Sequence, residues 1–165
     1  MRLKLAMTRF PQPSTTNRFL ADHVARLQAS LWHWTGRELI DSTLPAVEQA
    51  RALFEAPFIL VSHDTADDPV FNYGNRIALA LWEMSWDEFT ALPSRQSAES
   101  MEQSARARLL AEVTTHGFIT HYEGIRISRT GRRFLIQDAL VWNLLDETDQ
   151  PYGQAAMFSQ WTFLA

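Results

Sequence analysis

The last third of the chain, from Gly117 to Ala165, constrains the fold more than any other stretch. Residues 118–128, 133–145 and 152–163 are rich in β-branched and aromatic side chains, which favour β-strands. Short polar segments around Gly131 and Pro151 separate them and have the composition of turns. Strands joined by such short turns pair antiparallel, and here they follow a mostly helical first part. This order predicts an α+β fold.

The middle strand, 133–145, is apolar on both of its faces. Successive side chains of a strand point to opposite sides of the sheet, so alternate residues share a face. One predicted face carries Phe134, Ile136, Leu140, Trp142 and Leu144, and the other carries Leu135, Ala139, Val141 and Leu145. This pattern is typical of a central strand that is covered on each side. We expect the N-terminal helix to cover the outer face of the sheet.

The sequence predicts an extended leader over residues 1–17, followed by a single domain over 18–165 whose N-terminal helices occupy 18–56. The first helix has one narrow apolar stripe with alternating spacings of four and three residues, formed by Leu20, Val24, Leu27, Leu31 and Trp34. This stripe either packs on the chain's own sheet or pairs with a second copy. The working prediction is a homodimer through this helix.

Local signals place further elements between these two parts. A second helix is expected over residues 45–55, and the apolar runs 58–61 and 70–73 flank a polar turn, as in a hairpin. Asn75 stands where a helix N-cap is expected. Ser85 and Ser100 are each followed three residues later by Glu or Gln, the spacing of a capping box. Two more helices should begin there.

The composition excludes several classes of function. The 165 residues are 46% hydrophobic and 21% charged, which is typical of one globular domain. The net charge of -4 provides no basic field for nucleic acid, so no nucleic-acid partner is expected. The chain has no Cys, which excludes disulfides, thiolate metal sites and a covalent flavin adduct. No apolar run reaches membrane-spanning length, so we expect a cytoplasmic protein with no membrane partner.

No catalytic or metal motif emerges from the remaining polar residues. Ser62, His63 and Asp64 are neighbours on one strand and therefore point in alternating directions, unlike a triad, and turn hydrogen bonds are the expected role of His63 and Asp64. The Asp-rich turn after residue 63 lacks the Gly and the distant Glu of a calcium loop, so no metal is predicted. His116, at a helix end, is explained by helix electrostatics better than by haem ligation. Binding of haem or of non-covalent flavin is therefore disfavoured. The less favoured alternative function is an enzyme, or a haem or flavin protein, that uses His63, His116 or Asp138.

The order of elements, two short strands, small helices and three long strands, resembles that of a PAS domain. More closely, the chain resembles a stand-alone bacterial member of the MEKHLA family, which is PAS-related and also occurs at the end of certain plant homeodomain transcription factors. The similarity spans about Leu20 to Trp161 and rests on residues 56–58, 62–64, 73–75, 92–95, 97–99, 131–134, 141–143 and 153–156. It implies a five-stranded antiparallel sheet with helices on one face, a space for a small ligand and no known catalytic residue. No DNA-binding segment accompanies the match, so the plant proteins' transcriptional role does not transfer.

Polar residues on apolar segments are the candidates for a ligand site. A buried carboxylate such as Asp138 needs a partner, and Arg126, on the face of Tyr122, would provide one or would bind an anionic ligand. The predicted ligand-binding set is Asn75, Trp82, Tyr122, Arg126, Asp138, Trp142 and Gln154. Arg95, Ser97 and Glu99 either line the mouth of the pocket or hold the loop after Pro93. The predicted function is a non-catalytic sensory or small-molecule-binding and dimerisation domain in signalling, and the alternative is an interaction scaffold with a closed core.

Overall fold

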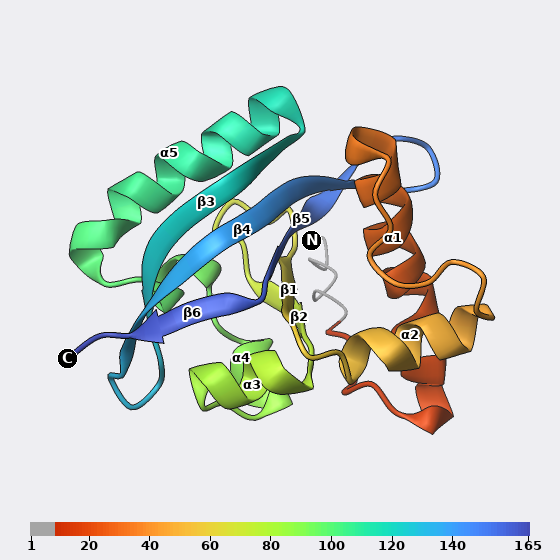
Figure 1. Cartoon of the computed structure of the whole chain (residues 1–165), viewed down its shortest axis with the longest axis horizontal. Coiled ribbons are helices and arrows are strands. Elements are labelled where there is room, and N and C mark those ends of the chain that lie inside the picture. Colours follow the sequence, from red (N-terminus) through yellow and green to blue (C-terminus); the bar gives the residue numbers. More distant parts are fainter. Residues whose placement is uncertain (1–8) are drawn as a thin grey trace, which may run out of the picture.

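The computed structural model describes residues 9–165, apart from the side chains of residues 100–103. Residues 1–8 of the expected leader therefore lie outside the described part. The strands are β1 (Ile59–His63), β2 (Phe71–Gly74), β3 (Phe118–Ile127), β4 (Arg133–Leu145), β5 (Pro151–Phe158) and β6 (Gln160–Phe163). They form an antiparallel sheet in the order β2-β1-β5-β4-β3, with β6 beside β4 (Figure 1). The predicted α+β class and antiparallel sheet are confirmed.

The sheet has one strand more than expected. The predicted last strand, 152–163, is interrupted at Ser159. Before the break β5 pairs with β1 and with the second half of β4, from Leu140 to Leu145. After it β6 pairs with the first half of β4, from Phe134 to Gln137. A single extended segment thus continues along β4 as two strands.

The α-helices after the first begin within one residue of the positions that the local signals predict. The helices are η1 (Thr15–Leu20), α1 (Ala21–Thr35), α2 (Ala46–Phe54), α3 (Arg76–Trp82), α4 (Trp86–Phe89), η2 (Ser94–Ser97) and α5 (Ser100–His116), where η denotes 3-10 helix. The first α-helix starts at Ala21, because the turn before it is 3-10 helix with left-handed backbone at three residues. Ser85 forms the expected capping box with Glu88, whereas the side chains of the other predicted box, Ser100 and Gln103, lie outside the described residues. Gly36 ends α1 in the left-handed conformation that glycine adopts readily.

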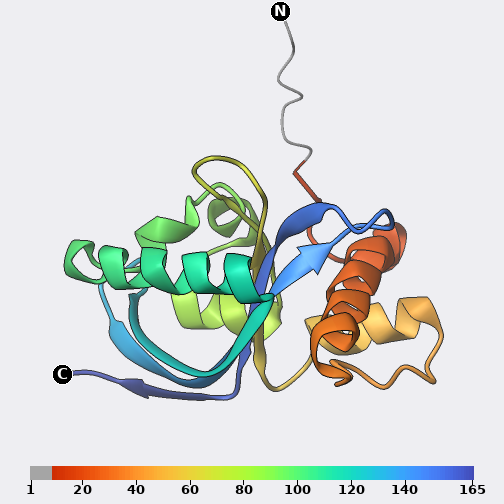
Figure 2. The same cartoon turned by 90° about the horizontal axis from the view of Figure 1, so that it is seen from above.

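Helices cover both faces of the sheet. The α3, α4, η2 and α5 segments lie on the inner face, and α1 and α2 lie on the outer face (Figures 1 and 2). On the outer side Leu27 and Leu31 of α1 belong to the same buried cluster as Leu140 and Trp142 of β4, and the Trp142 indole donates to the carbonyl of Leu27 at 3.3 Å. The expected cover of the outer face by the N-terminal helix is confirmed.

The inner face has an aromatic core at one end. Trp82 of α3 lies edge-on to Phe134 of β4, with ring centroids 5.2 Å apart, and tilted against Phe89 at 5.8 Å. Phe71 stacks on Phe89 at 4.3 Å. At the other end Leu109 and Val113 of α5 form a separate cluster on Val141. Between the two clusters the helices and the sheet enclose a cavity.

Candidate functional site

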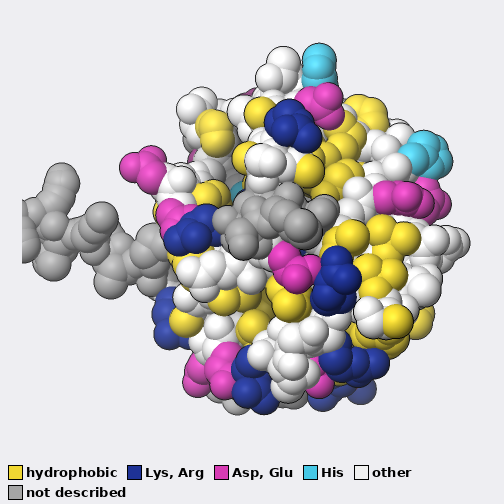
Figure 3. Space-filling view, turned by 90° about the vertical axis from the view of Figure 1, so that its left-hand side faces the viewer, with side chains coloured by type: hydrophobic (Ala, Val, Ile, Leu, Met, Phe, Trp, Pro, Cys, Tyr) yellow, Lys and Arg dark blue, Asp and Glu magenta, His cyan; other side chains and the backbone are white. Residues whose placement is uncertain are grey.

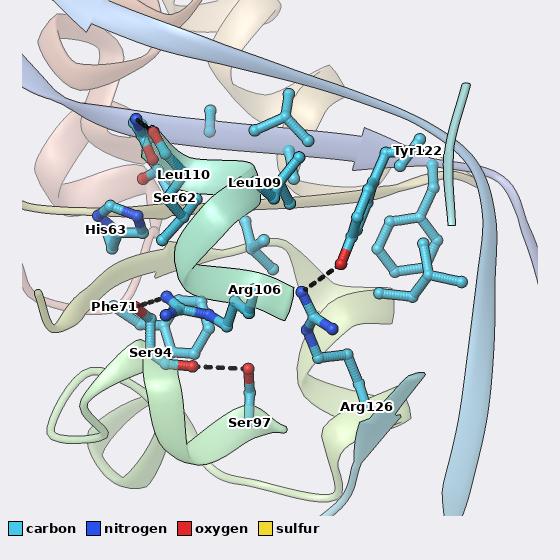
Figure 4. A pocket seen from close by; sticks show the side chains of 18 of the residues that line it. Ser62, His63, Phe71, Ser94, Ser97, Arg106, Leu109, Leu110, Tyr122 and Arg126 are labelled. Atoms are coloured by element: carbon cyan, nitrogen blue, oxygen red, sulfur yellow. Dashed lines mark hydrogen bonds between the residues drawn. The ribbon is translucent and has the colours of Figure 1, made fainter. Parts of the chain in front are cut away.

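A cavity of about 70 Å³ lies between the inner face of the sheet and α5. Most of its wall is apolar. Its polar lining comes from His63 of β1, Arg106 of α5, Arg126 of β3 and Gln154 of β5, with Ser94 and Ser97 of η2 at one end (Figure 4). Elements far apart in the sequence therefore bring their polar groups to one space. Four of the predicted ligand residues line it, namely Trp82, Tyr122, Arg126 and Gln154.

A bulge in β4 determines which residues of this strand reach the cavity. Asp138 has a φ of 54°, in the left-handed region, and its partner segment in β3 carries register shifts on both sides of Tyr122. An extra residue in a strand reverses the side to which every later side chain points. Ile136 faces the cavity before the bulge, and Ala139 and Val141 face it afterwards. The predicted alternation, which ran unbroken through the strand, is wrong beyond Asp138.

The bulge removes two residues from the predicted ligand set. Trp142 lies on the opposite face of the sheet, fully buried against α1. Asp138 is exposed and contacts His121 at 2.5 Å, and His121 also has a left-handed backbone. The expectation that Asp138 is a buried carboxylate paired with Arg126 is therefore wrong.

Asn75 has a structural role instead of a place at the cavity. Its side-chain oxygen accepts hydrogen bonds from the backbone N–H of Ala78, as a helix cap, and of Leu60. Its amide donates to the carbonyls of Leu53 and Phe58 at 3.1 and 2.8 Å. The side chain is fully buried with all of these bonds made, so it ties α2, β1 and α3 together.

Arg126 is held at the cavity by its own strand. Its guanidinium donates to the Tyr122 hydroxyl at 3.3 Å and to the Ile125 carbonyl at 2.9 Å. Gly124 lies between Arg126 and Tyr122, and a Cβ there would come within 2.2 Å of the Tyr122 hydroxyl and 3.0 Å of the Arg126 Nη1. The absence of a side chain at this position leaves room for the pair.

Arg106 is the site residue that sequence reasoning missed. It extends from α5 toward η2, where it donates to the Ser94 hydroxyl, and the Ser97 hydroxyl bonds the Ser94 carbonyl at 2.7 Å (Figure 4). Burial, and next the neighbouring charge of Arg126, lower the pKa of Arg106 to about 10, so it stays cationic at neutral pH. One signal was available: Arg106 precedes Leu109 by three residues and Val113 by seven, on the apolar side of the helix.

The loop residues around η2 divide between the two expected roles. Ser97 lines the cavity. Arg95 instead forms an ion pair with Asp68 at 3.0 Å, and Glu99 bonds Arg133. Both of these pairs hold the loop.

His63 and Gln154 face each other on paired strands and each leaves one polar atom without a partner. His63 Nδ1 contacts the carbonyl of Asp64 at 2.9 Å, which only accepts, so Nδ1 carries the proton and Nε2 is an acceptor. Gln154 donates through its amide nitrogen to Asn143, Thr114 and Leu110. His63 Nε2 and Gln154 Oε1 are both buried, and neither makes a hydrogen bond of good geometry. Burial is the main cause that lowers the pKa of His63, against a smaller opposing effect of the nearby Gln154 side chain, so the ring is neutral.

A second hollow, of about 370 Å³, adjoins the cavity between α5 and the loop that follows β1. The two spaces share His63, Leu110 and Gln154 as wall residues. Gln154 bridges from β5 to α5 at this boundary. A small molecule entering from this side would pass these three side chains.

The apolar stripe of α1 lies in the chain's own core. Val24, Leu27 and Leu31 are buried against β4 and α2, with exposed fractions of 2%, 0% and 1%. Leu20 and Trp34 pack against the same cluster, and the Trp34 indole donates to the carbonyl of Asn143 at 2.9 Å. In this structure the stripe therefore packs on the chain's own sheet and on α2, which is the first of the two predicted arrangements, and it is not free to pair with a second copy.

A buried polar network also crosses the outer layer. The Tyr152 hydroxyl lies 2.9 Å from His23 Nδ1, His23 Nε2 lies 3.0 Å from the Ser62 hydroxyl, and Ser62 donates to Asn72 at 2.5 Å. Because the Ser62 proton is used on Asn72, Ser62 accepts from His23, and His23 Nδ1 then accepts from Tyr152. The network requires a neutral imidazole, and burial lowers the pKa of His23 to about 3.

The described part of the chain meets neither the requirements of a metal site nor those of a membrane-spanning helix. Among the described residues, no group of three or more His, Asp and Glu side chains is placed to hold a metal ion. Nor does any helix in the described part of the chain have the length and apolarity to cross a membrane.

Solved structures define the class of fold. A PAS domain from Colwellia psychrerythraea superposes with a TM-score of 0.58 at 15% identity, over 67% of this chain and 91% of that chain. A light-oxygen-voltage domain studied with a flavin analogue superposes with a TM-score of 0.56 at 15% identity, over 72% of this chain and 85% of that chain. An RNA-binding light-oxygen-voltage receptor gives 0.57 at 18% identity, over 72% of this chain and 34% of that chain. The fold is that of a PAS domain.

Sequence comparison then gives the family. The MEKHLA domain model matches residues 21–163, and the chain belongs to the MEKHLA family. Two curated relatives are the homeobox-leucine zipper proteins HOX32 of Oryza sativa, subspecies indica and japonica. Each is 24% identical over 134 residues, which are 79% of this chain and 15% of the relative. The chain thus matches about 15% of the length of these curated relatives.

Proposed function

We propose that this chain is a non-catalytic PAS-like sensory domain that binds a small molecule in the cavity between the sheet and α5, in signalling or regulation. One observation carries the proposal. Of the four buried side-chain atoms without a hydrogen-bond partner among the described residues, three belong to residues that line this cavity: His63, Trp82 and Gln154. An unpaired buried polar group costs ~1–3 kcal/mol. A ligand that bonds these atoms removes that cost.

The size of the cavity restricts the ligand. Pockets for drug-sized molecules have volumes of about 300–1,000 Å³. The cavity here measures about 70 Å³ and is filled at one end by Trp82. A flavin-sized molecule would require the aromatic core to move, so the space favours a ligand of a few carbon atoms.

The absence of catalytic geometry supports a binding role. Among the described residues that line the cavity there is no Asp or Glu. The buried Ser62–His23 pair has a histidine whose lowered pKa makes it a poor general base near pH 7. His116 and Asp138, offered above for an enzyme, are both exposed. Among the described residues, the cavity therefore offers no carboxylate to act with His63 as an acid–base pair.

One face of the molecule carries charged side chains of both signs (Figure 3). On the face in Figure 3, Lys and Arg side chains alternate with Asp and Glu, with hydrophobic side chains between them. Phosphate binding depends on a basic field, and the net charge of the sequence is -4, so we propose no nucleic-acid partner.

Dimerisation remains a separate prediction. A homodimer through α1 would have to use the exposed side of the helix, because the apolar stripe is buried. Trp32 lies on that side and is 59% exposed. Size-exclusion chromatography with light scattering of the wild type and of Trp32→Lys tests this: a monomeric wild type contradicts the dimer, and a dimer that the substitution dissociates supports it.

The binding proposal is tested by filling the cavity. Ala139 is 1% exposed and lines it, so Ala139→Leu should occupy the space that a ligand needs. Ala107→Leu, on the exposed side of α5, is the matched control. Native mass spectrometry of freshly purified protein and a thermal-shift screen of small metabolites should detect a ligand for the wild type and the control but not for Ala139→Leu. If no compound binds, and Ala139→Leu melts at an equal or higher temperature, the space is a packing void and the proposal is wrong.

A further inference from the structure

The cavity is lined by two positive charges that have no negative partner among the side chains that the structure describes. The guanidinium groups of Arg106 and Arg126 both line it, and each residue is 8% exposed. Among the side chains of residues 9–99 and 104–165, no carboxylate lies within 4.0 Å of either group. Five ion pairs form elsewhere in this part of the chain, and none involves these two residues. Arg106 and Arg126 are thus the two most buried arginines among the described residues, and neither forms an ion pair with a described side chain.

Neutral groups orient these charges but do not neutralise them. Arg106 bonds the Ser94 hydroxyl, and Arg126 bonds the Tyr122 hydroxyl and the Ile125 carbonyl. Arg126 also lies over the Tyr122 ring, 5.8 Å from its centroid. Burying a charge in a protein is unfavourable unless an opposite charge or several hydrogen bonds compensate. Two like charges beside one space therefore favour an anion in that space.

Two other polar residues of the same cavity, His63 and Gln154, lack a hydrogen-bond donor instead of an acceptor. His63 Nε2 and Gln154 Oε1 are both lone-pair acceptors without a donor, as the hydrogen bonds of their other atoms show. Each would gain a hydrogen bond from an O–H group. The lining of the cavity also includes Ile136, Ala139 and Phe158, against which a short carbon chain would pack.

We propose that the ligand is a small hydroxycarboxylic acid, whose carboxylate binds Arg106 and Arg126 and whose hydroxyl donates to His63 or Gln154. This inference rests on the proposed function, because it assigns the occupant of the same cavity. A planar carboxylate matches the fork of a guanidinium, which makes two parallel hydrogen bonds to it. The volume of about 70 Å³ would hold a few water molecules or an acid of that size.

The test is a set of matched small probes. Glycolate, lactate and 3-hydroxybutyrate are the hydroxy acids, propionate lacks the hydroxyl, lactamide lacks the charge, and inorganic phosphate is an anion of another shape. Melting temperature and isothermal titration calorimetry are measured for each. At a hundredfold excess over its Kd, the best hydroxy acid should raise the melting temperature by at least ~5 °C. Propionate should bind more weakly and lactamide should not bind.

Variants connect the binding to the two arginines. Arg106→Gln and Arg126→Gln should each weaken the hydroxy acid at least about tenfold, since each removes a charged hydrogen-bond partner. Arg108→Gln, on the exposed side of the same helix, is the control and should bind like the wild type. If Arg106→Gln fails to fold, Arg106→Lys keeps the charge but loses the fork and should still weaken binding measurably.

The acidic residue Glu102, one helical turn before Arg106, supplies one more control. Glu102 precedes Arg106 by four residues, and its side chain lies outside the described part of the structure. Glu102→Gln should leave the Kd of the hydroxy acid within about twofold. A tenfold tighter Kd in Glu102→Gln would mean that Glu102 already neutralises Arg106, and the inference would be overturned.

The outcomes separate this inference from the proposed function. If lactamide or another neutral compound bound as well as the hydroxy acids and Ala139→Leu abolished its binding, the sensory proposal would stand and the anionic ligand would be wrong. Equal binding of phosphate and lactate would overturn the hydroxy-acid assignment as well. If none of the hydroxy acids shifted the melting temperature at roughly 10 mM, the inference would fail, whatever other compounds bind.

Discussion

The buried His23 should make the stability of this domain fall as the solution becomes mildly acidic. In the native network His23 is neutral, donates to Ser62 and accepts from Tyr152. Burial lowers its pKa from 6.5 to about 3. In the unfolded chain the imidazole regains its ordinary pKa, so below pH 6.5 the unfolded state binds a proton that the native state does not. Unfolding therefore becomes more favourable as the pH falls from 6.5 toward 3.

The size of the effect follows from this difference. At pH 5 the solution is about 1.5 pH units below the ordinary pKa, and each unit is worth about 1.4 kcal/mol, so His23 alone should lower the free energy of unfolding by ~2 kcal/mol relative to pH 7.5. The pKa of His63 is also lowered by burial and adds a loss in the same direction. The other three histidines, His33, His116 and His121, are exposed. A window from pH 7.5 to 5 thus reports mainly on the two buried rings.

Urea denaturation followed by tryptophan fluorescence measures the effect, since the chain has six Trp. His23→Gln keeps a group that donates and accepts but cannot be protonated. This variant should lose ~2 kcal/mol less than the wild type between pH 7.5 and 5, whatever its stability at pH 7.5. The matched control is His33→Gln, an exposed residue on the same helix, which should keep the wild-type slope. A wild type whose stability is flat across the window, or an unchanged slope in His23→Gln, refutes the argument.

Substitutions at three further positions test the roles of particular backbone and side-chain groups. Asn75→Ala removes a helix cap and leaves the Leu53 and Phe58 carbonyls unbonded, so urea denaturation should show a loss of ~3 kcal/mol. Gly153→Ala should cost about 2–3 kcal/mol in the same assay, because φ there is 149° and a Cβ would lie 2.1 Å from the His63 carbonyl oxygen. Asp138→Gly should leave stability within about 1 kcal/mol, since glycine accepts the left-handed backbone, whereas Asp138→Val should cost about 1–2 kcal/mol. Equal effects of the two Asp138 substitutions would contradict the bulge.

The elements with strong local signals could be predicted from the sequence. Ser85 with Glu88 fixes the start of α4 by its own hydrogen bonds, and Asn75 caps α3 in the same way. The continuous apolar pattern of residues 133–145 predicted a central strand with cover on both sides, and α1 provides that cover. Such features depend on neighbours along the chain, so the sequence alone carries them.

The cavity was harder to predict because its residues depend on contacts between distant elements. Arg126 and Tyr122 are two strand positions on one face, and that regular spacing made them visible. Arg106 lies in a helix whose other side is polar, and an arginine there is ordinarily a solvent-exposed residue. Its burial follows from the position of η2, where Ser94 accepts its hydrogen bond. Nothing local in the sequence specifies that contact.

The bulge at Asp138 explains why the apolar pattern of β4 predicted a central strand correctly but assigned the residues after 138 to the wrong faces of the sheet. Before the bulge Phe134 and Ile136 pack in the inner core, and after it Leu140, Trp142 and Leu144 pack in the outer core. A strand with perfect alternation would send all five to one side, because the side-chain period is two. The signal is weak in the sequence, since aspartate adopts a left-handed backbone only occasionally and glycine is the usual marker. The same one-residue shift turns Ala139 and Val141 toward the cavity, so two small or branched side chains, and not Trp142, form its floor and leave it open.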